Sequence, residues 1–257
     1  MRTSFVSLPT SAGLQVAGLL RTPREATTPV GAVLICHGSD GVDGRGEYYA
    51  GALNAAGLAT LEIDMWAARS TSRGAAGRPR SPMETLPDAF AALKFLGEQP
   101  EIDPARIGIL GFSWGGVVSL LSATQGRADP LRGDLAGFAA HAAHYPVCYA
   151  YTADPRMALS DLTGAPILIQ TGDIDTYDHP DAGAKLAEAL SSQGTAKVRN
   201  ITYAGAGHGF DRDLPPQTIN DPFAHNGAGG PVLMEFNREA AEAARDEVVG
   251  FFVAALT

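Results

Sequence analysis

The chain has 257 residues, a hydrophobic fraction of 45% and a formal net charge of −9 at pH 7. This length can bury one large core, so we expect a single domain over residues 1–257. The negative charge disfavours nucleic acid and anionic membranes as partners, and no apolar run approaches the roughly 20 residues of a membrane span. Two cysteines, Cys36 and Cys148, and an N-terminus without a long apolar core are typical of a cytoplasmic protein.

An antiparallel hairpin is predicted first, because strand-like residues 5–8 and 14–20 flank a turn at residues 9–13. From Gly31 onward, strand-like and helix-like segments alternate, which predicts an α/β architecture with a mostly parallel sheet covered by helices on both faces. The predicted strands lie near 31–36, 58–63, 106–111, 137–143, 166–171 and 197–203. The predicted helices lie near 45–56, 85–98, 114–125, 181–193 and 236–255. The segment 211–233 is expected to be a connection that forms either a wall of the site or a partial lid.

The segment Gly111-Phe112-Ser113-Trp114-Gly115 is the most informative motif of the chain. It follows a short apolar strand and precedes an apolar helix, and its glycines give the backbone room for a sharp turn around the serine. This G-x-S-x-G pattern in a strand-to-helix setting predicts a nucleophile elbow, with the Ser113 hydroxyl exposed at the end of the sheet.

A serine nucleophile needs a base and an acid that orients the base. His208 lies between two glycines directly after the strand-like run 197–203, where its imidazole can reach back to Ser113. Three acids follow the strand-like run 166–171. We expect Asp173 to close the turn and Asp178 to cap the next helix, which leaves Asp175 as the orienting acid.

A glycine-rich turn, His37-Gly38-Ser39-Asp40-Gly41, follows the first buried strand. Such a turn can direct a backbone N–H at a developing oxyanion, so the N–H groups of Ser39 and Trp114 are the predicted donors of an oxyanion hole. His37 is expected to tie down the loop. Trp66 and Phe210 are candidates to line a substrate pocket, although core packing is an equal alternative for Trp66.

These motifs together resemble the dienelactone hydrolase family of α/β-hydrolases. The resemblance rests on His37-Gly38, the elbow, Gly172-x-x-Asp175 and the run from Gly205 to Asp211, and it extends over nearly the whole chain. It implies an α/β-hydrolase fold with the triad Ser113, Asp175 and His208. Dienelactone hydrolase proper has a cysteine at the elbow, so the serine here is similar to that of the general carboxylesterases in the family.

The resemblance also implies a role for one arginine. The segment 64–69 is similar to the family segment that supplies a carboxylate-binding arginine, which makes Arg69 a candidate to bind a substrate carboxylate. Arg73, Arg78 and Arg80 follow in the same loop, where a solvated loop without a ligand is the favoured interpretation. His141 and His144 are three residues apart, but no carboxylate lies in their immediate run, and a structural role is favoured over a metal site.

We therefore expect a cofactor-independent hydrolase that cleaves small-molecule esters or lactones, without a metal ion, and a homodimer is left open. One alternative is a serine peptidase of the prolyl-oligopeptidase kind, which would usually bring a large additional domain. Another is a ligand-binding α/β-hydrolase relative that has lost turnover. The complete set of Ser113, Asp175 and His208 argues against the second alternative.

Overall fold

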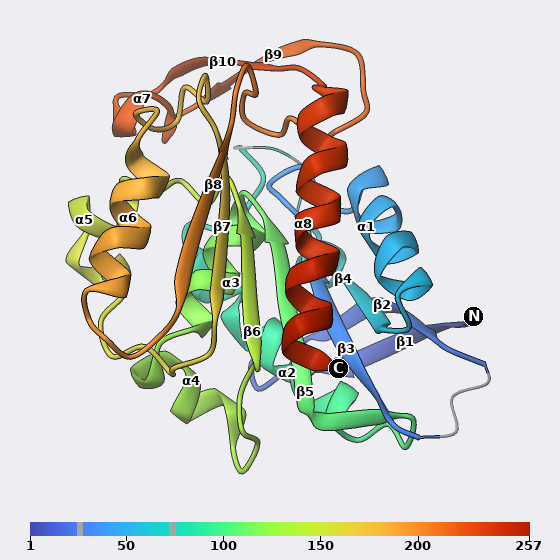
Figure 1. The fold of residues 1–257 in the computed structure, drawn as a ribbon. Coiled ribbons are helices and arrows are strands. Elements are labelled where there is room, and N and C mark those ends of the chain that lie inside the picture. Colours follow the sequence, from blue (N-terminus) through green and yellow to red (C-terminus); the bar gives the residue numbers. More distant parts are fainter. Residues whose placement is uncertain (25–27, 72–73, 75) are drawn as a thin grey trace.

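The computed structural model describes residues 1–24, 28–71, 74 and 76–257. Within these residues, one eight-stranded sheet has the strand order β1-β2-β4-β3-β5-β6-β7-β8 (Figure 1). Its strands are β1 (Arg2–Pro9), β2 (Gln15–Thr22), β3 (Val30–Cys36), β4 (Ala59–Asp64), β5 (Ile102–Phe112), β6 (Ala140–His144), β7 (Ile167–Gly172) and β8 (Val198–Tyr203). The first two strands form the expected antiparallel pair and β2 runs antiparallel to β4, whereas the neighbours from β4 to β8 are parallel. This topology is that of an α/β-hydrolase.

Helices cover both faces of the sheet. On one face, α1 (Gly44–Ala55) and α8 (Arg238–Leu256) lie in front of the strands in Figure 1 and share one apolar core with them. On the other face, α2 (Leu86–Gly97), α3 (Trp114–Ser122) and α6 (Ala182–Ser191) contribute to a larger core. The remaining helices are shorter: α4 (Gln125–Arg132), α5 (Ala150–Ala153), α7 (Ala224–Gly227), and the 3₁₀ turns η1 (Ala67–Arg69), η2 (Pro82–Glu84) and η3 (Pro155–Met157).

The central strands are apolar because they are covered on both sides. Every residue of β7 is buried, and so is every residue of β3 after Val30. The edge strand β1 instead shows exposed residues between partly buried ones, as expected for a strand with one face toward solvent. The parallel strands β3 to β8 therefore bring their carboxyl ends to the same edge of the sheet, where ligands bind in open parallel folds.

Several parts of the chain differ from the sequence prediction, among them the short helices α4, α5 and α7 and the earlier start of β5 at Ile102. Helix α4 was not predicted, because its sequence is polar and includes Pro130. The segment 211–233, expected as a connection, contains β9 (Gln217–Asp221) and most of β10 (Gly230–Met234), which pair antiparallel. Val232 and Met234 pack on Tyr177 and Ala224 in a small separate core, and this packing explains why a short polar segment forms a hairpin.

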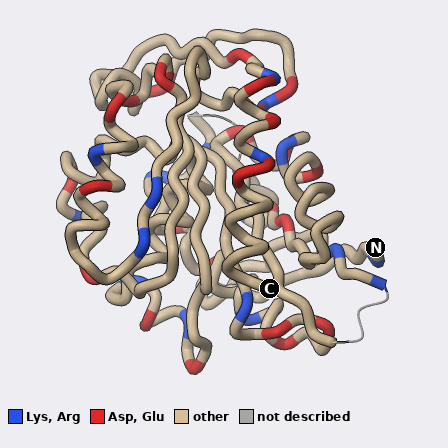
Figure 2. Tube along the Cα trace, viewed as in Figure 1, with Lys and Arg blue, Asp and Glu red and all other residues tan. Residues whose placement is uncertain are grey.

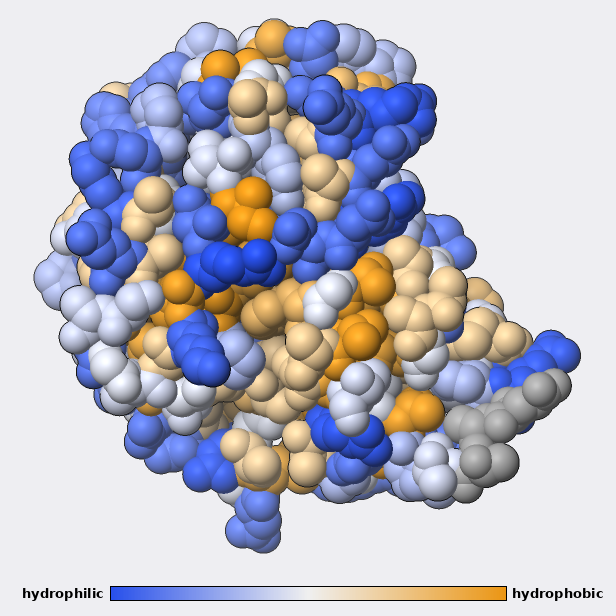
Figure 3. Space-filling model, in the orientation of Figure 1, coloured by the Kyte–Doolittle hydropathy of each residue, from blue (hydrophilic) through white to orange (hydrophobic). Residues whose placement is uncertain are grey.

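Charged residues lie on the helices and loops, and the central strands carry few of them (Figure 2). On the face seen in Figure 3, apolar residues are exposed across the middle of the molecule, where β8 and α8 lie in Figure 1. In the described part of the chain, no helix combines the length and the apolar character that crossing a membrane requires.

Candidate active site

Ser113 stands at the sharp turn between β5 and α3. Its backbone has φ 50° and ψ −108°, a conformation that costs a non-glycine residue free energy and that is common at functional sites. The flanking glycines are required by space: a Cβ atom on Gly111 would lie 1.9 Å from the carbonyl oxygen of Gly115, and one on Gly115 would lie 2.1 Å from that of Cys36. The turn is therefore built as the sequence motif predicts.

The structure brings Ser113, His208 and Asp175 into one hydrogen-bonded chain. His208 Nε2 lies 2.9 Å from Ser113 Oγ, and His208 Nδ1 lies 2.8 Å from Asp175 Oδ2. The imidazole and the carboxylate are both buried, with 3% and 6% of their residues' surface exposed. With Nδ1–H donating to the carboxylate, Nε2 is the nitrogen that can accept the Ser113 proton.

The loops after β7 and β8 hold this chain in place. Asp175 Oδ1 accepts a hydrogen bond from the Tyr177 N–H at 2.9 Å, and the Tyr177 ring lies against His208 with centroids 4.0 Å apart. Asp173 accepts from the Gly205 N–H at 2.7 Å, so it ties the two loops together as a turn-closing residue. The prediction that Asp178 caps the following helix is wrong. Its carboxylate accepts from the N–H groups of Cys148 and Tyr149.

The loop that carries Ser39 is fixed from three sides. The Ser39 carbonyl accepts from Trp66 Nε1 at 3.0 Å and from the Gly74 N–H at 2.9 Å, and Ser39 Oγ accepts from Arg78 Nη1 at 2.7 Å. Both Ser39 and Trp114, the two predicted oxyanion donors, line the same cavity as Ser113. Their role as donors stays a prediction.

His37 acts as an anchor of this loop. Its Nε2 accepts a hydrogen bond from the Met65 N–H at 2.9 Å, which leaves Nδ1–H to donate to the Gly38 carbonyl at 2.8 Å. Burial lowers the pKa of His37 to about 4, so the ring is neutral at pH 7. Both ring nitrogens are engaged with backbone, in agreement with the structural role expected for this histidine.

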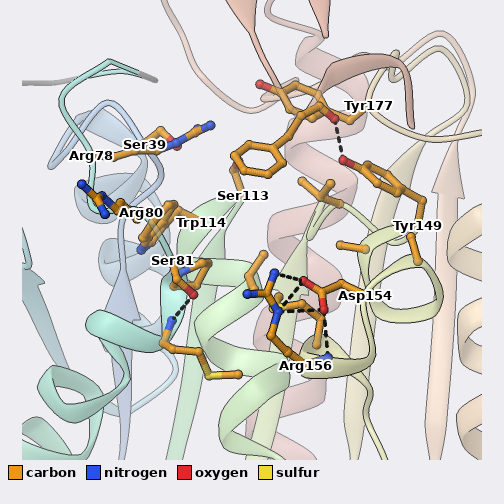
Figure 4. A pocket seen from close by; sticks show the side chains of 18 residues that line it. Ser39, Arg78, Arg80, Ser81, Ser113, Trp114, Tyr149, Asp154, Arg156 and Tyr177 are labelled. Carbon is orange, nitrogen blue, oxygen red and sulfur yellow. Dashed lines mark hydrogen bonds and ion pairs between the residues drawn. The ribbon is translucent and has the colours of Figure 1, made fainter. Parts of the chain in front are cut away.

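A cavity of about 550 Å³ opens at Ser113. In Figure 4, Ser113 and Tyr177 lie toward one end of this cavity, whereas Asp154 and Arg156 lie at the opposite end. Its lining comes from Ser39, the 78–83 segment, the start of α3, the 147–157 segment, Tyr177 and Phe223. Phe223 follows β9, so the segment after His208 supplies part of the wall.

A model of the dienelactone hydrolase family matches residues 16–256. The chain belongs to the dienelactone hydrolase family.

Several solved structures share the fold. A putative dienelactone hydrolase from Klebsiella pneumoniae is 17% identical and superposes with a TM-score of 0.70 over 98% of each chain. A dienelactone hydrolase from Anabaena variabilis is 21% identical, with a TM-score of 0.64 over 100% of this chain and 99% of that one. A thermostable carboxylesterase from a metagenomic library is 18% identical, with a TM-score of 0.69 over 100% of this chain and 90% of that one.

Among curated sequences, an uncharacterized protein of Mycobacterium tuberculosis is 32% identical over 189 residues. The match covers 69% of this chain and 62% of that protein.

Within this member of the dienelactone hydrolase family, Arg69 does not face the cavity. Its guanidinium makes two hydrogen bonds to Asp88, at 2.6 and 3.1 Å, and donates to the carbonyls of Met65 and Glu84. The Asp88 side chain has no exposed surface. The expectation that Arg69 binds a substrate carboxylate is therefore corrected: Arg69 neutralises a buried acid, a partner that lies 19 residues further along the chain.

Trp66 and Phe210 also lie outside the cavity lining. Trp66 is 3% exposed and uses its indole N–H to hold the Ser39 carbonyl. Phe210 has no exposed surface and packs on the rings of Tyr145, His144 and Tyr203. Both expectations of substrate contact are corrected, because a position beside a catalytic element in sequence does not place a ring on the cavity surface.

The sequence interpretation missed Arg78, Tyr177 and Phe223. Arg78 was assigned to a solvated loop, but its side chain is 8% exposed and forms an ion pair with Asp221. Its guanidinium also lies over the rings of Trp114 and Phe223. Arg80 lines the cavity as well, and Arg73 lies outside the described residues. The high density of arginines in this loop was the signal that the sequence offered. It did not reveal the role of Arg78, because the partner of Arg78 lies 143 positions away in the chain.

His141 and His144 have the expected structural role. His141 Nδ1 lies 2.9 Å from the Ser119 carbonyl oxygen. His144 lies between Asp211 and Gln170, with ring nitrogens 3.1 and 2.9 Å from their side chains. Both histidines are completely buried in the sheet, where each ring supports packing.

Proposed function

We propose that this chain is a carboxylic ester hydrolase that cleaves esters or lactones of small molecules through an acyl-enzyme on Ser113. The observation that carries the proposal is the continuous hydrogen-bonded chain from Asp175 through His208 to Ser113, which ends at a cavity large enough for a small organic molecule. Membership in the dienelactone hydrolase family supports the same reaction class.

In this proposal, His208 removes the Ser113 proton as the oxygen attacks the ester carbonyl, and Asp175 stabilises the imidazolium that forms. The N–H groups of Ser39 and Trp114 hold the negative charge that develops on the carbonyl oxygen. His208 then protonates the leaving alcohol, and a water molecule releases the acyl group by the reverse path. No cofactor takes part in any of these steps.

Labelling and turnover test the proposal together. A fluorophosphonate probe should label the native protein, and hydrolysis of p-nitrophenyl acetate should fall by on the order of 10³-fold or more in Ser113→Ala. Ser81→Ala is a matched control, because Ser81 lines the same cavity without a histidine partner among the described contacts. A folded Ser113→Ala protein that keeps most of its activity and its labelling would refute the proposal.

A further inference from the structure

The wall of the cavity between Ser113 and its far end is apolar. Side chains from four separate elements form it: Met83 of η2, Val117 of α3, Ala150 and Ala153 of α5, and Met157 of η3. An apolar wall supplied by several elements stabilises a chain of methylene groups by removing it from water, and it offers few partners to a polar group.

Of the three arginines that line the cavity, Arg78 and Arg156 are paired with acids. Arg78 is bound by Asp221, and Arg156 is bound by Asp154 through hydrogen bonds of 2.7–3.2 Å. Arg69, the arginine expected to hold a carboxylate, is bound by Asp88 behind the cavity. A carboxylate that entered would give up its hydration for two weak partners: Arg78, whose charge is compensated by Asp221, and Arg156, which is paired with Asp154 and whose side chain is 87% exposed to water. Arg80 also lines the cavity, but it is exposed, where water and salt screen its charge.

We infer that this cavity selects esters that carry an extended, uncharged apolar chain on one side of the scissile bond, and that it discriminates against chains that end in a carboxylate. The inference rests on the proposed ester hydrolysis and adds the substrate class to it. Ala153 is an exposed residue of this lining with a small side chain, so a larger side chain at this position would occupy space that a long ester chain needs.

Two ester series test the chain-length part. The first varies the acyl group of p-nitrophenyl esters from acetate through butanoate and hexanoate to octanoate. The second varies the alcohol of alkyl acetates over the same lengths. In one series, kcat/KM should rise by about three- to fourfold for each added methylene until the cavity is filled, and that series identifies the side of the ester that the cavity holds. Flat profiles in both series would overturn the inference.

Ala153→Phe tests the site. A phenyl group at this position should fill the cavity, lower kcat/KM for the favoured long ester by about tenfold or more, and leave p-nitrophenyl acetate within about twofold. Thr152→Phe is the control, because Thr152 is exposed on the same short helix and lies outside the lining. Equal losses for long and short esters in Ala153→Phe, or equal effects in the two variants, would contradict the assignment.

A pair of esters matched in acyl-chain length but different in charge tests the second part. p-Nitrophenyl pentanoate and the p-nitrophenyl monoester of glutaric acid have acyl chains of the same length, and only the second ends in a carboxylate. The neutral ester should have a kcat/KM at least about tenfold higher. A preference for the anionic ester would overturn the inference. If the protein hydrolyses no ester at all and the fluorophosphonate does not label it, the proposed function fails rather than this inference.

Discussion

Arg78 and Asp221, 143 positions apart in the chain, form a two-point ion pair beside the candidate active site. The Arg78 nitrogens lie 2.8 and 3.0 Å from the two carboxylate oxygens of Asp221, and Nη1 also donates to Ser39 Oγ at 2.7 Å. Burial is the largest single influence and opposes ionisation of Asp221, but the hydrogen bonds and charge of Arg78, together with hydrogen bonds from the Phe223 N–H and from Tyr177, outweigh it and lower the pKa of that carboxyl. One guanidinium thus joins the loop that carries Ser39, its own loop and the end of β9.

This arrangement predicts that Arg78 acts on turnover through Ser39. In Arg78→Lys, a single ammonium cannot reproduce the fork that holds Ser39 and Asp221 together, so the Ser39 N–H loses part of its fixed orientation. We expect kcat for p-nitrophenyl butanoate to fall by about tenfold or more while KM changes little, because an oxyanion donor acts mainly in the transition state.

Arg156→Lys is the control for this variant, since Arg156 lines the same cavity in an exposed pair with Asp154. It should leave kcat nearly unchanged. A rise in KM at constant kcat in Arg78→Lys would mean that Arg78 holds the substrate and not the Ser39 loop.

A second prediction separates the two acids of the loop after β7. Asp175→Asn should lower kcat by about 10⁴-fold, because an amide at this position favours the wrong imidazole tautomer toward Ser113. Asp173→Asn removes only the charge that accepts from the Gly205 N–H, and it should cost less than about tenfold. Steady-state kinetics of both variants on one ester measure the ranking, and the reverse order would exclude Asp175 as the orienting acid.

A third prediction concerns stability. Burial raises the pKa of Asp88, and Arg69 opposes that rise with two hydrogen bonds. In Arg69→Met, the buried carboxylate loses its partner, so the free energy of unfolding in urea should fall by about 3–5 kcal/mol.

The double variant Arg69→Met/Asp88→Leu should recover most of this loss, because it replaces both charges by apolar groups. Activity per folded molecule on the pentanoate and glutarate esters should change by the same factor. A selective loss on the anionic ester would restore the original expectation that Arg69 binds a carboxylate.

A fourth prediction follows from the buried ring of His141. Burial lowers its pKa in the folded protein from 6.5 to about 4, so the unfolded chain takes up a proton first as the pH falls. The contribution of the neutral His141 ring to the free energy of unfolding is complete above pH 6.5 and is lost as the pH falls toward 4. The free energy of unfolding of the native protein should therefore decrease through this window more steeply than that of His141→Gln, by up to about 1.4 kcal/mol per pH unit.

Urea unfolding at pH 7, 6 and 5 gives the two slopes. His37 has a shift of the same sign and is present in both proteins, so its contribution cancels in the comparison. Identical slopes would show that His141 is protonated as easily in the folded chain as in the unfolded one.

The sequence was sufficient to predict the fold and the candidate triad, because both depend on local patterns. Short apolar runs bounded by turns located the strands from β3 to β8, since buried parallel strands are apolar on both faces. The elbow was readable because only glycine fits at positions 111 and 115 around a strained serine. The β9–β10 hairpin escaped notice because its apolar residues, Val232 and Met234, find their partner in Tyr177, more than fifty residues earlier.

The tertiary structure decided what surrounds the reacting groups. Sequence order placed Trp66, Arg69 and Phe210 near the catalytic elements, but proximity along the chain does not set the direction of a side chain. Arg69 pairs with Asp88 and does not line the cavity, because a carboxylate without exposed surface requires a cation. Arg78 pairs with the buried carboxylate of Asp221 for the same reason, and it also donates a hydrogen bond to Ser39. The sequence by itself determined the fold and the candidate triad around Ser113, because these rest on local patterns, whereas the pairing of distant charges decided which side chains line the cavity.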